Sequence, residues 1–151
     1  MDQQVKLAIE KSVLCWLATV DSDGMPNVSP KEIFTYAADD TLLIAHIASP
    51  QSVANIRHHA QVCVSFVDVF EQRGYKLKGT AQLVQQDDSR YAGYLQRLRQ
   101  LADERFPIQA IIVISVTSVQ PVVAPSYWLF ADTTVEQQVD NALRTYKVSR
   151  P

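Results

Sequence analysis

The chain has 151 residues, of which 47% are hydrophobic and 20% charged, with a formal net charge of −2. This length and composition predict one domain with a hydrophobic core, and the near-neutral charge argues against nucleic acid as a partner, because binding to a phosphate backbone needs a basic face. No apolar stretch approaches the roughly 20 residues of a membrane span, and the polar N-terminus does not resemble a signal peptide, so we expect a cytoplasmic protein without a membrane partner.

The first part of the chain predicts one helix followed by three strands. Residues 2–12 carry apolar side chains at helical spacing, with Asp2 as a candidate N-terminal cap. The following apolar and β-branched runs alternate with clusters of turn-forming residues, which is the pattern of strands joined by hairpins. We expect these strands at residues 14–20, 27–36 and 41–47, with turns at residues 21–24 and 37–40.

The rest of the chain predicts two helices and three more strands. The run that ends at Ser49-Pro50 should lead directly into a short helix, because Ser is a favoured N-cap and Pro a favoured first helical residue. A longer helix should follow the capping residues 87–89 and end near residue 106, since apolar side chains as far as Leu101 repeat at helical spacing. Strands are expected at residues 62–68, at residues 75–84, where Gly79 indicates a bulge or a close backbone approach, and at residues 108–119.

This order of elements predicts a mainly β fold. Six strands joined mostly by hairpins exclude a doubly wound parallel sheet, which needs a helix after nearly every strand. An antiparallel barrel with peripheral helices fits better. We expect a single domain over residues 1–151, with an N-terminal helix (1–12), a barrel (13–120) and a C-terminal extension (121–151) that has a polar amphipathic segment at 135–146.

The predicted helix start at Ser49-Pro50 is also a candidate anion site. The first amides of a helix have no backbone partner, and the helix dipole adds partial positive charge there. The hydroxyls of Ser49 and Ser52 lie in the same turn. Such a site suits a phosphate group, although for an isolated Ser-Pro-x-Ser an ordinary capped helix is the simpler interpretation.

Several segments, taken in order, resemble a known family. Residues 28–34 read VSPKEIF, and residues 44–66 read IAHIASPQSVANIRHHAQVCVSF. A Lys-x-Lys-Gly-Thr-Ala strand (76–81) and an Ile-x-Val-x-x-Val strand (114–119) follow, before Pro-Ser-Tyr at 125–127. The order and spacing of these segments are similar to the pyridoxamine 5′-phosphate oxidase-like family of FMN-binding split barrels. The resemblance implies a six-stranded antiparallel split barrel, a homodimer, and FMN bound at the subunit interface.

The resemblance also implies a set of cofactor-binding residues, which come from two strands and one helix start. They are Val28, Ser29, Pro30 and Lys31 along the flavin ring, Ala45 and His46 beside the ring or the ribityl chain, Ser49, Gln51 and Ser52 at the phosphate, and Asn55 one helical turn further on. Many relatives carry Arg or Lys where this chain has Gln51 and Ser52, and a lost cation weakens the grip on a phosphate dianion. Arg57 or Lys31 could supply that charge from nearby.

Other interpretations stay open for several of these side chains. Lys31 either stabilises the reduced flavin near its N1 and O2 edge or faces solvent as an ordinary strand lysine. His46 is more simply a core or dimer-interface histidine than a base, and Trp16 a core or dimer-interface residue. The pair Tyr127-Trp128 either closes over a partner's flavin, as the resemblance implies, or packs on the barrel.

The sequence offers no other chemistry of this kind. Cys15 and Cys63 lie in apolar runs without Cys-x-x-Cys spacing, which predicts two buried thiols rather than a disulfide or a metal site. The adjacent His58 and His59 point about 100° apart on a helix and have no further ligand at a useful spacing, so we expect no metal. No catalytic triad, Walker loop or dinucleotide-binding glycine pattern can be assembled, and the catalytic residues stay unknown.

The function predicted first is therefore an FMN-binding oxidoreductase that acts on an unknown small molecule. A true pyridoxamine phosphate oxidase is not expected, because the chain is short and lacks the extra basic residues for a second phosphate-bearing substrate. The alternatives are a deazaflavin-dependent or flavin reductase, and a non-catalytic, flavin-free binding or redox-sensing module. The absence of cations at Gln51 and Ser52 favours the last of these.

Overall fold

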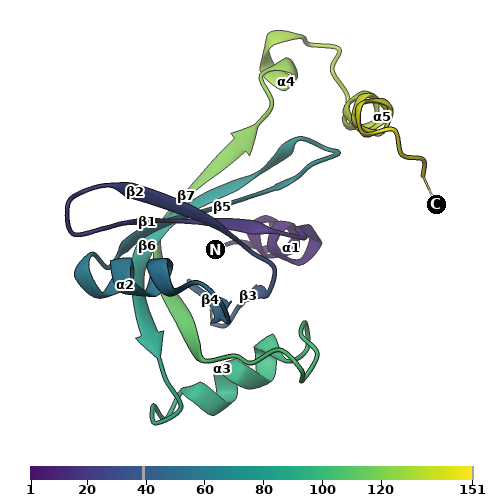
Figure 1. The fold of residues 1–151 in the computed structure, drawn as a ribbon. Helices are drawn as coiled ribbons and strands as arrows, with labels where there is room; N and C mark the ends of the chain where they lie inside the picture. Colours follow the sequence, from purple (N-terminus) through teal and green to yellow (C-terminus); the bar gives the residue numbers. More distant parts are fainter. Residues whose placement is uncertain (39, 151) are drawn as a thin grey trace.

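The computed structural model describes residues 1–38 and 40–150, which form a sheet with helices around it (Figure 1). In chain order the elements are α1 (Gln3–Lys11), β1 (Cys15–Val20), β2 (Pro26–Lys31), β3 (Phe34–Tyr36), β4 (Thr41–His46), α2 (Pro50–His58), β5 (Gln61–Asp68), β6 (Arg73–Val84), α3 (Tyr91–Leu98), β7 (Ala110–Val123), α4 (Ser126–Leu129) and α5 (Val135–Tyr146). No helix in these residues is both long and apolar enough to cross a bilayer.

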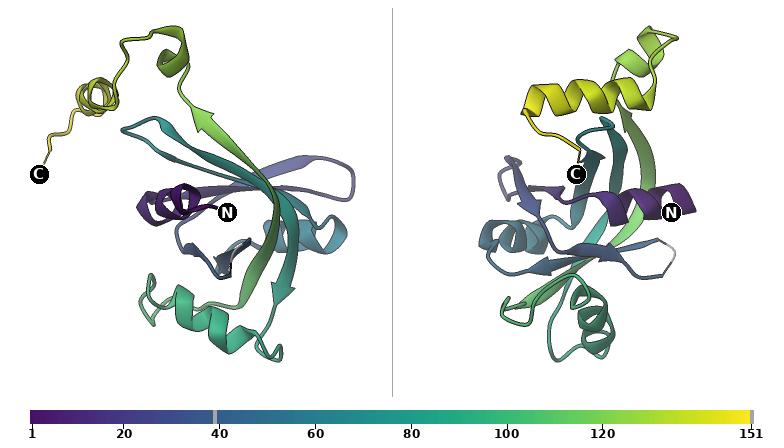
Figure 2. Two further views of the ribbon diagram at one scale, coloured as in Figure 1. Left: turned by 180° about the vertical axis from the view of Figure 1, so that it is seen from behind. Right: turned by 90° about the vertical axis from the view of Figure 1, so that its right-hand side faces the viewer.

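The strands form one antiparallel sheet in the order β2-β1-β5-β6-β7-β4-β3. The two edge strands, β2 and β3, are separated in sequence only by Glu32 and Ile33. Because so short a connection spans only about 10 Å, the sheet must curl until its edges approach each other (Figure 2). The predicted antiparallel split barrel is confirmed. It has seven strands rather than six because the chain passes from one sheet edge to the other within the predicted strand 27–36, which divides it into β2 and β3.

Strand β4 and residues 110–114 at the start of β7 are buried on both faces, which explains their continuous apolar runs. Leu42 and Ile44 of β4 pack in the cluster inside the curled sheet, together with Val5 and Ile9 of α1. The alternate β4 residues, Leu43 and Ala45, pack in a second cluster that α3 covers. The prediction for α3 was too long: Leu101 is exposed, so the last apolar position of the pattern does not reach the core and the helix ends at Leu98.

Gly79 lies at an irregularity between β6 and β7, as predicted. The register shifts between Lys78 and Gly79. A Cβ atom on Gly79 would lie 2.2 Å from the carbonyl oxygen of Ser115, so the backbones approach too closely for any side chain. Cys63, by contrast, corrects a prediction: it is half-buried because it lies opposite Ala18 on the outer side of the sheet, and only Cys15 is fully buried.

The C-terminal extension leaves the barrel at the end of β7, and α4 and α5 stand away from the sheet (Figure 2). It is tied to the β5–β6 turn, where the Tyr127 hydroxyl donates to the carbonyl of Glu71 at 2.7 Å and the Tyr146 ring meets Phe70 edge-on at 6.0 Å between centroids. The predicted turn at 37–40 closes through a hydrogen bond from Thr41 N to Ala38 O, and its residue 39 lies outside the described residues.

A candidate anion and cofactor site

Helix α2 begins where the sequence predicts, with Ser49 as its N-cap and Pro50 as its first residue. The Ser49 hydroxyl makes no capping bond to the helix backbone. It accepts a hydrogen bond from the Lys31 ammonium instead, at 2.7 Å. A cation from β2 therefore lies at the positive end of the α2 dipole, which is an arrangement that attracts anions.

Lys31 is the centre of a polar cluster that joins β2 to α2. Its ammonium also donates to the Ser29 hydroxyl at 2.5 Å, and that hydroxyl lies 3.0 Å from the hydroxyl of Ser52. Lys31 is 6% exposed and Ser52 is 1% exposed. We call Ser29, Lys31, Ser49 and Ser52 the serine–lysine cluster. The solvent-facing interpretation of Lys31 is thus wrong: it is the last residue of β2, where the alternation of the strand turns it away from solvent.

The charge of Lys31 is not compensated within the described residues, where no acidic side chain bonds or ion-pairs with it. Burial lowers the pKa of its ammonium from the usual 10.5, with Cys15 acting in the opposite direction. Cys15 lies directly opposite Lys31 in the β1–β2 ladder, but burial raises the pKa of that thiol to about 12, so it is neutral at pH 7. A buried cation without a counter-ion is unfavourable, and an anion at the start of α2 would remove that cost.

Asn55 and Gln51 belong to a neighbouring network that holds α2 on the sheet. The Asn55 amide donates to Thr19 Oγ1 of β1 at 2.9 Å, and the Gln51 amide donates to Asn55 Oδ1 at 2.7 Å. Asn55 and Thr19 are each 1% exposed. The sequence analysis missed Thr19, although one signal was present. Thr19 is a polar residue on the face of β1 that also carries Cys15 and Leu17 at alternate positions, and that face is buried.

The other predicted site residues lie in different surroundings. Val28 and Pro30 are exposed, because they alternate along β2 with the inward-facing Ser29 and Lys31. Ala45 is 6% exposed and packs in the cluster beneath α3. His46 is 8% exposed at the end of β4, and burial, then the positive charges of Lys31 and Arg57, lower the pKa of its imidazole below 6.5. Among the residues that the structure describes, no three His, Cys, Asp or Glu side chains gather as a metal site.

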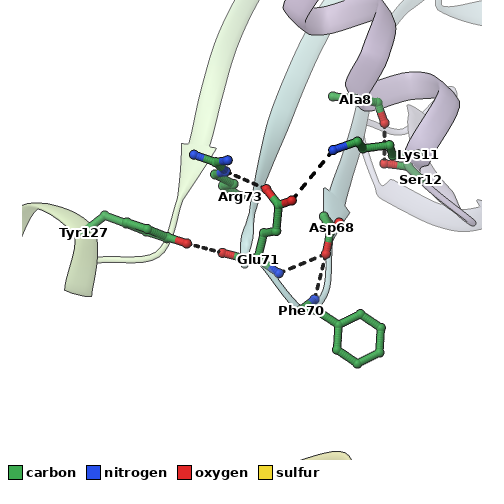
Figure 3. Close-up of polar contacts among 8 residues, drawn as sticks. All are labelled: Ala8, Lys11, Ser12, Asp68, Phe70, Glu71, Arg73 and Tyr127. Carbon is green, nitrogen blue, oxygen red and sulfur yellow. Dashed lines mark hydrogen bonds and ion pairs between the residues drawn. The ribbon is translucent and has the colours of Figure 1, made fainter. Parts of the chain in front are cut away.

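A separate cleft of about 390 Å³ lies between α1, the β5–β6 turn and the end of β7. Glu71 bridges its two cations, 2.8 Å from Arg73 and 3.8 Å from Lys11, and Tyr127 reaches the same turn (Figure 3). Its lining contains none of the predicted site residues. The first member of the Tyr127-Trp128 pair is therefore anchored on the barrel, whereas Trp128 is 70% exposed.

Comparison with known proteins agrees with the fold. HupZ of Group A Streptococcus is 27% identical, with a TM-score of 0.67 over 79% of this chain and 91% of that one. Two other proteins share the fold. An FMN-binding protein from Syntrophomonas wolfei has 17% identity and a TM-score of 0.61, over 80% of this chain and 90% of that one. The heme storage protein HutZ from Vibrio cholerae has 19% identity and a TM-score of 0.63, over 81% of this chain and 93% of that one. No protein with a curated description matches the sequence. The sequence profile described as pyridoxamine 5′-phosphate oxidase matches residues 1–123, most of the chain, and the protein therefore belongs to that family.

Proposed function

We propose that this protein is a cytoplasmic flavoprotein that binds FMN non-covalently and serves as an oxidoreductase for a small molecule. The observation that carries the proposal is the buried ammonium of Lys31, which faces the start of α2 and has no acidic partner among the residues that the structure describes. Membership of the family and the shared fold of an FMN-binding protein support a flavin as the source of the anion. Bound FMN would supply two-electron transfer, and the chain would supply orientation and charge.

The serine–lysine cluster is proposed to hold the phosphate of FMN. Lys31 would replace the cations that many relatives carry at the positions of Gln51 and Ser52, because its ammonium reaches the N-cap Ser49 of the same helix from β2. The hydroxyls of Ser49 and Ser52 and the first amides of α2 would donate to the phosphate oxygens. In this arrangement Lys31 contacts the phosphate rather than the N1 edge of the flavin ring. Gln51 and Asn55 act indirectly by fixing α2 to β1.

The double substitution Ser49→Ala/Ser52→Ala should weaken FMN binding by about 10- to 100-fold, since it removes two hydroxyl donors to a charged group. Quenching of flavin fluorescence during titration measures this affinity. The matched control is Ser22→Ala/Ser89→Ala, which changes two exposed serines outside the cluster and should leave the affinity unchanged. Equal affinities for the two double variants would place the phosphate elsewhere.

The absorbance spectrum of the purified protein distinguishes FMN from a deazaflavin or a haem.

The outer face of β1 and β2 is the proposed contact with a second copy of the chain. Trp16 and Val28 are 46% and 56% exposed, and the ladder places Trp16 opposite Pro30 and Val28 opposite Ala18 on that face. An exposed apolar patch of this kind is typical of an interface. Ser29 and Lys31 of the serine–lysine cluster lie on the opposite side of β2 from this face. A partner bound to the outer face would therefore place FMN close to the subunit boundary.

Trp16→Glu should therefore shift the protein from dimer to monomer, because a carboxylate would be buried in an apolar contact. Sedimentation velocity across a range of concentrations measures the change. Leu101→Glu is the control, since Leu101 is 57% exposed after α3, outside this face. A monomeric wild-type protein would contradict the proposed dimer and leave the FMN proposal to its own test.

A further inference from the structure

His46 has the one buried side-chain polar atom that lacks a hydrogen-bond partner within the described residues, its Nδ1. Buried polar atoms are nearly always paired, and leaving one unpaired costs about 1–3 kcal/mol. The imidazole is unsatisfied in either tautomer, because Nδ1 lacks an acceptor when it carries the proton and lacks a donor when it does not. The environment of His46 is therefore incomplete in the chain alone.

The unpaired Nδ1 belongs to a residue that lies close in the chain to the proposed anion site. It is the last residue of β4, shortly before the N-cap Ser49. Its backbone is fixed, since its carbonyl accepts from Gln109 N at 2.9 Å and the residue pairs with Ala110 of β7, which carries no charge. The charged groups that act on the ring are Lys31 from β2 and Arg57 from α2. Burial and then these two positive charges lower the pKa of the imidazole below 6.5, which favours the neutral ring at pH 7 in the ligand-free site.

A phosphate dianion at the start of α2 would reverse this electrostatic balance. Its two negative charges would offset the ammonium of Lys31 and favour a positive charge on a buried ring nearby. An imidazolium would carry protons on both nitrogens, and the anion, directly or through a water, would supply the acceptor that Nδ1 lacks.

We infer that His46 takes up a proton from solvent when the phosphate of the flavin binds, and that it thereby helps the site to select a phosphorylated flavin over riboflavin. This inference rests on the proposed function. His46 acts as a specificity-determining residue whose protonation is linked to ligand binding. The linkage gives a signature that a merely structural histidine would not give.

Titration calorimetry with FMN at about pH 7.5, in two buffers with different ionisation enthalpies, measures the protons taken up on binding. The phosphate of FMN is largely dianionic at this pH, because its second pKa is about 6, so its own contribution is small. We expect uptake of about half to one proton per FMN in the wild type and in His58→Gln, which changes an exposed histidine on α2. We expect no uptake in His46→Gln. Riboflavin should bind the wild type more weakly and without proton uptake.

A second measurement does not depend on the folding of a variant. Proton NMR of the wild type should show that the His46 imidazole titrates at higher pH when FMN is bound than when it is absent. Equal proton uptake by the wild type and His46→Gln, or no shift of the His46 titration, would overturn the inference while FMN binding itself stood. If FMN fails to bind the wild type, the proposed function and the inference fall together.

Discussion

Replacing Lys31 with methionine should weaken FMN binding by about 30-fold or more and, in the absence of ligand, raise the free energy of unfolding by about 1 kcal/mol or more. Affinity falls while stability rises, because the Lys31 ammonium attracts a bound anion but is an uncompensated buried charge when no anion is present. Methionine is also unbranched and only one atom shorter than lysine, and it removes the buried charge. Fluorescence titration gives the affinity, and urea unfolding of the ligand-free protein gives the stability.

The pH dependence of this comparison follows from the lowered pKa of Lys31. The folded state releases the lysine proton at a lower pH than the unfolded chain does, so stability rises with pH between the lowered pKa and the usual value of 10.5. The gain in stability of Lys31→Met over the wild type should be complete below the lowered pKa and shrink as the pH approaches 10.5. Lys78→Met is the matched control, because Lys78 is exposed on β6. A Lys31→Met protein that is less stable than the wild type at neutral pH would show that the interactions of the ammonium outweigh the cost of burying it, and would contradict this prediction.

Gly79→Ala should destabilise the protein by about 3 kcal/mol, a cost typical of severe backbone or packing conflicts. The new Cβ would lie 2.2 Å from the Ser115 carbonyl oxygen and 3.0 Å from a methyl carbon of Ile114, so β6 and β7 would have to separate at the centre of the sheet. Thermal and urea unfolding measure the loss. The expected effect is independent of FMN, because the contact lies outside the serine–lysine cluster.

Gly93→Ala provides the control with the same chemical change. Gly93 is exposed within α3, and a Cβ there meets nothing within 4 Å. Since alanine favours helix, this substitution should stabilise the protein by up to about 1 kcal/mol. Similar stabilities for the two variants would mean that the β6–β7 pair opens at little cost.

Local chemistry explains which parts of the fold could be predicted from the sequence. The start of α2 at Ser49-Pro50 and the irregularity at Gly79 depend on residues close in the chain, and both are confirmed. The division of one predicted strand at Glu32-Ile33 depends on where the two sheet edges lie in space, which no local pattern contains. The extension of β7 to Val123 likewise follows from pairing with β6, whose Arg73 is its partner.

The candidate site follows the same division. Ser49 and Ser52 lie three positions apart in the same helical turn, so the proximity of their hydroxyls could be predicted. The burial of Lys31 could not, because it depends on α2 covering the end of β2. The bond between Asn55 and Thr19 joins residues far apart in the chain and also required the folded sheet. The side chains predicted from the sequence remain predictions until FMN binding is measured.

The alternation along β2 has one more consequence. A slip of this edge strand by a single residue would turn the Lys31 ammonium outward and bring Pro30 to the mouth of α2, while Val28 would rotate away from the outer surface. The proposed anion site and the proposed dimer face therefore both depend on the register of the β1–β2 ladder. If both proposals hold, an anion bound at Lys31 would stabilise this register, and FMN binding and dimer formation should each strengthen the other.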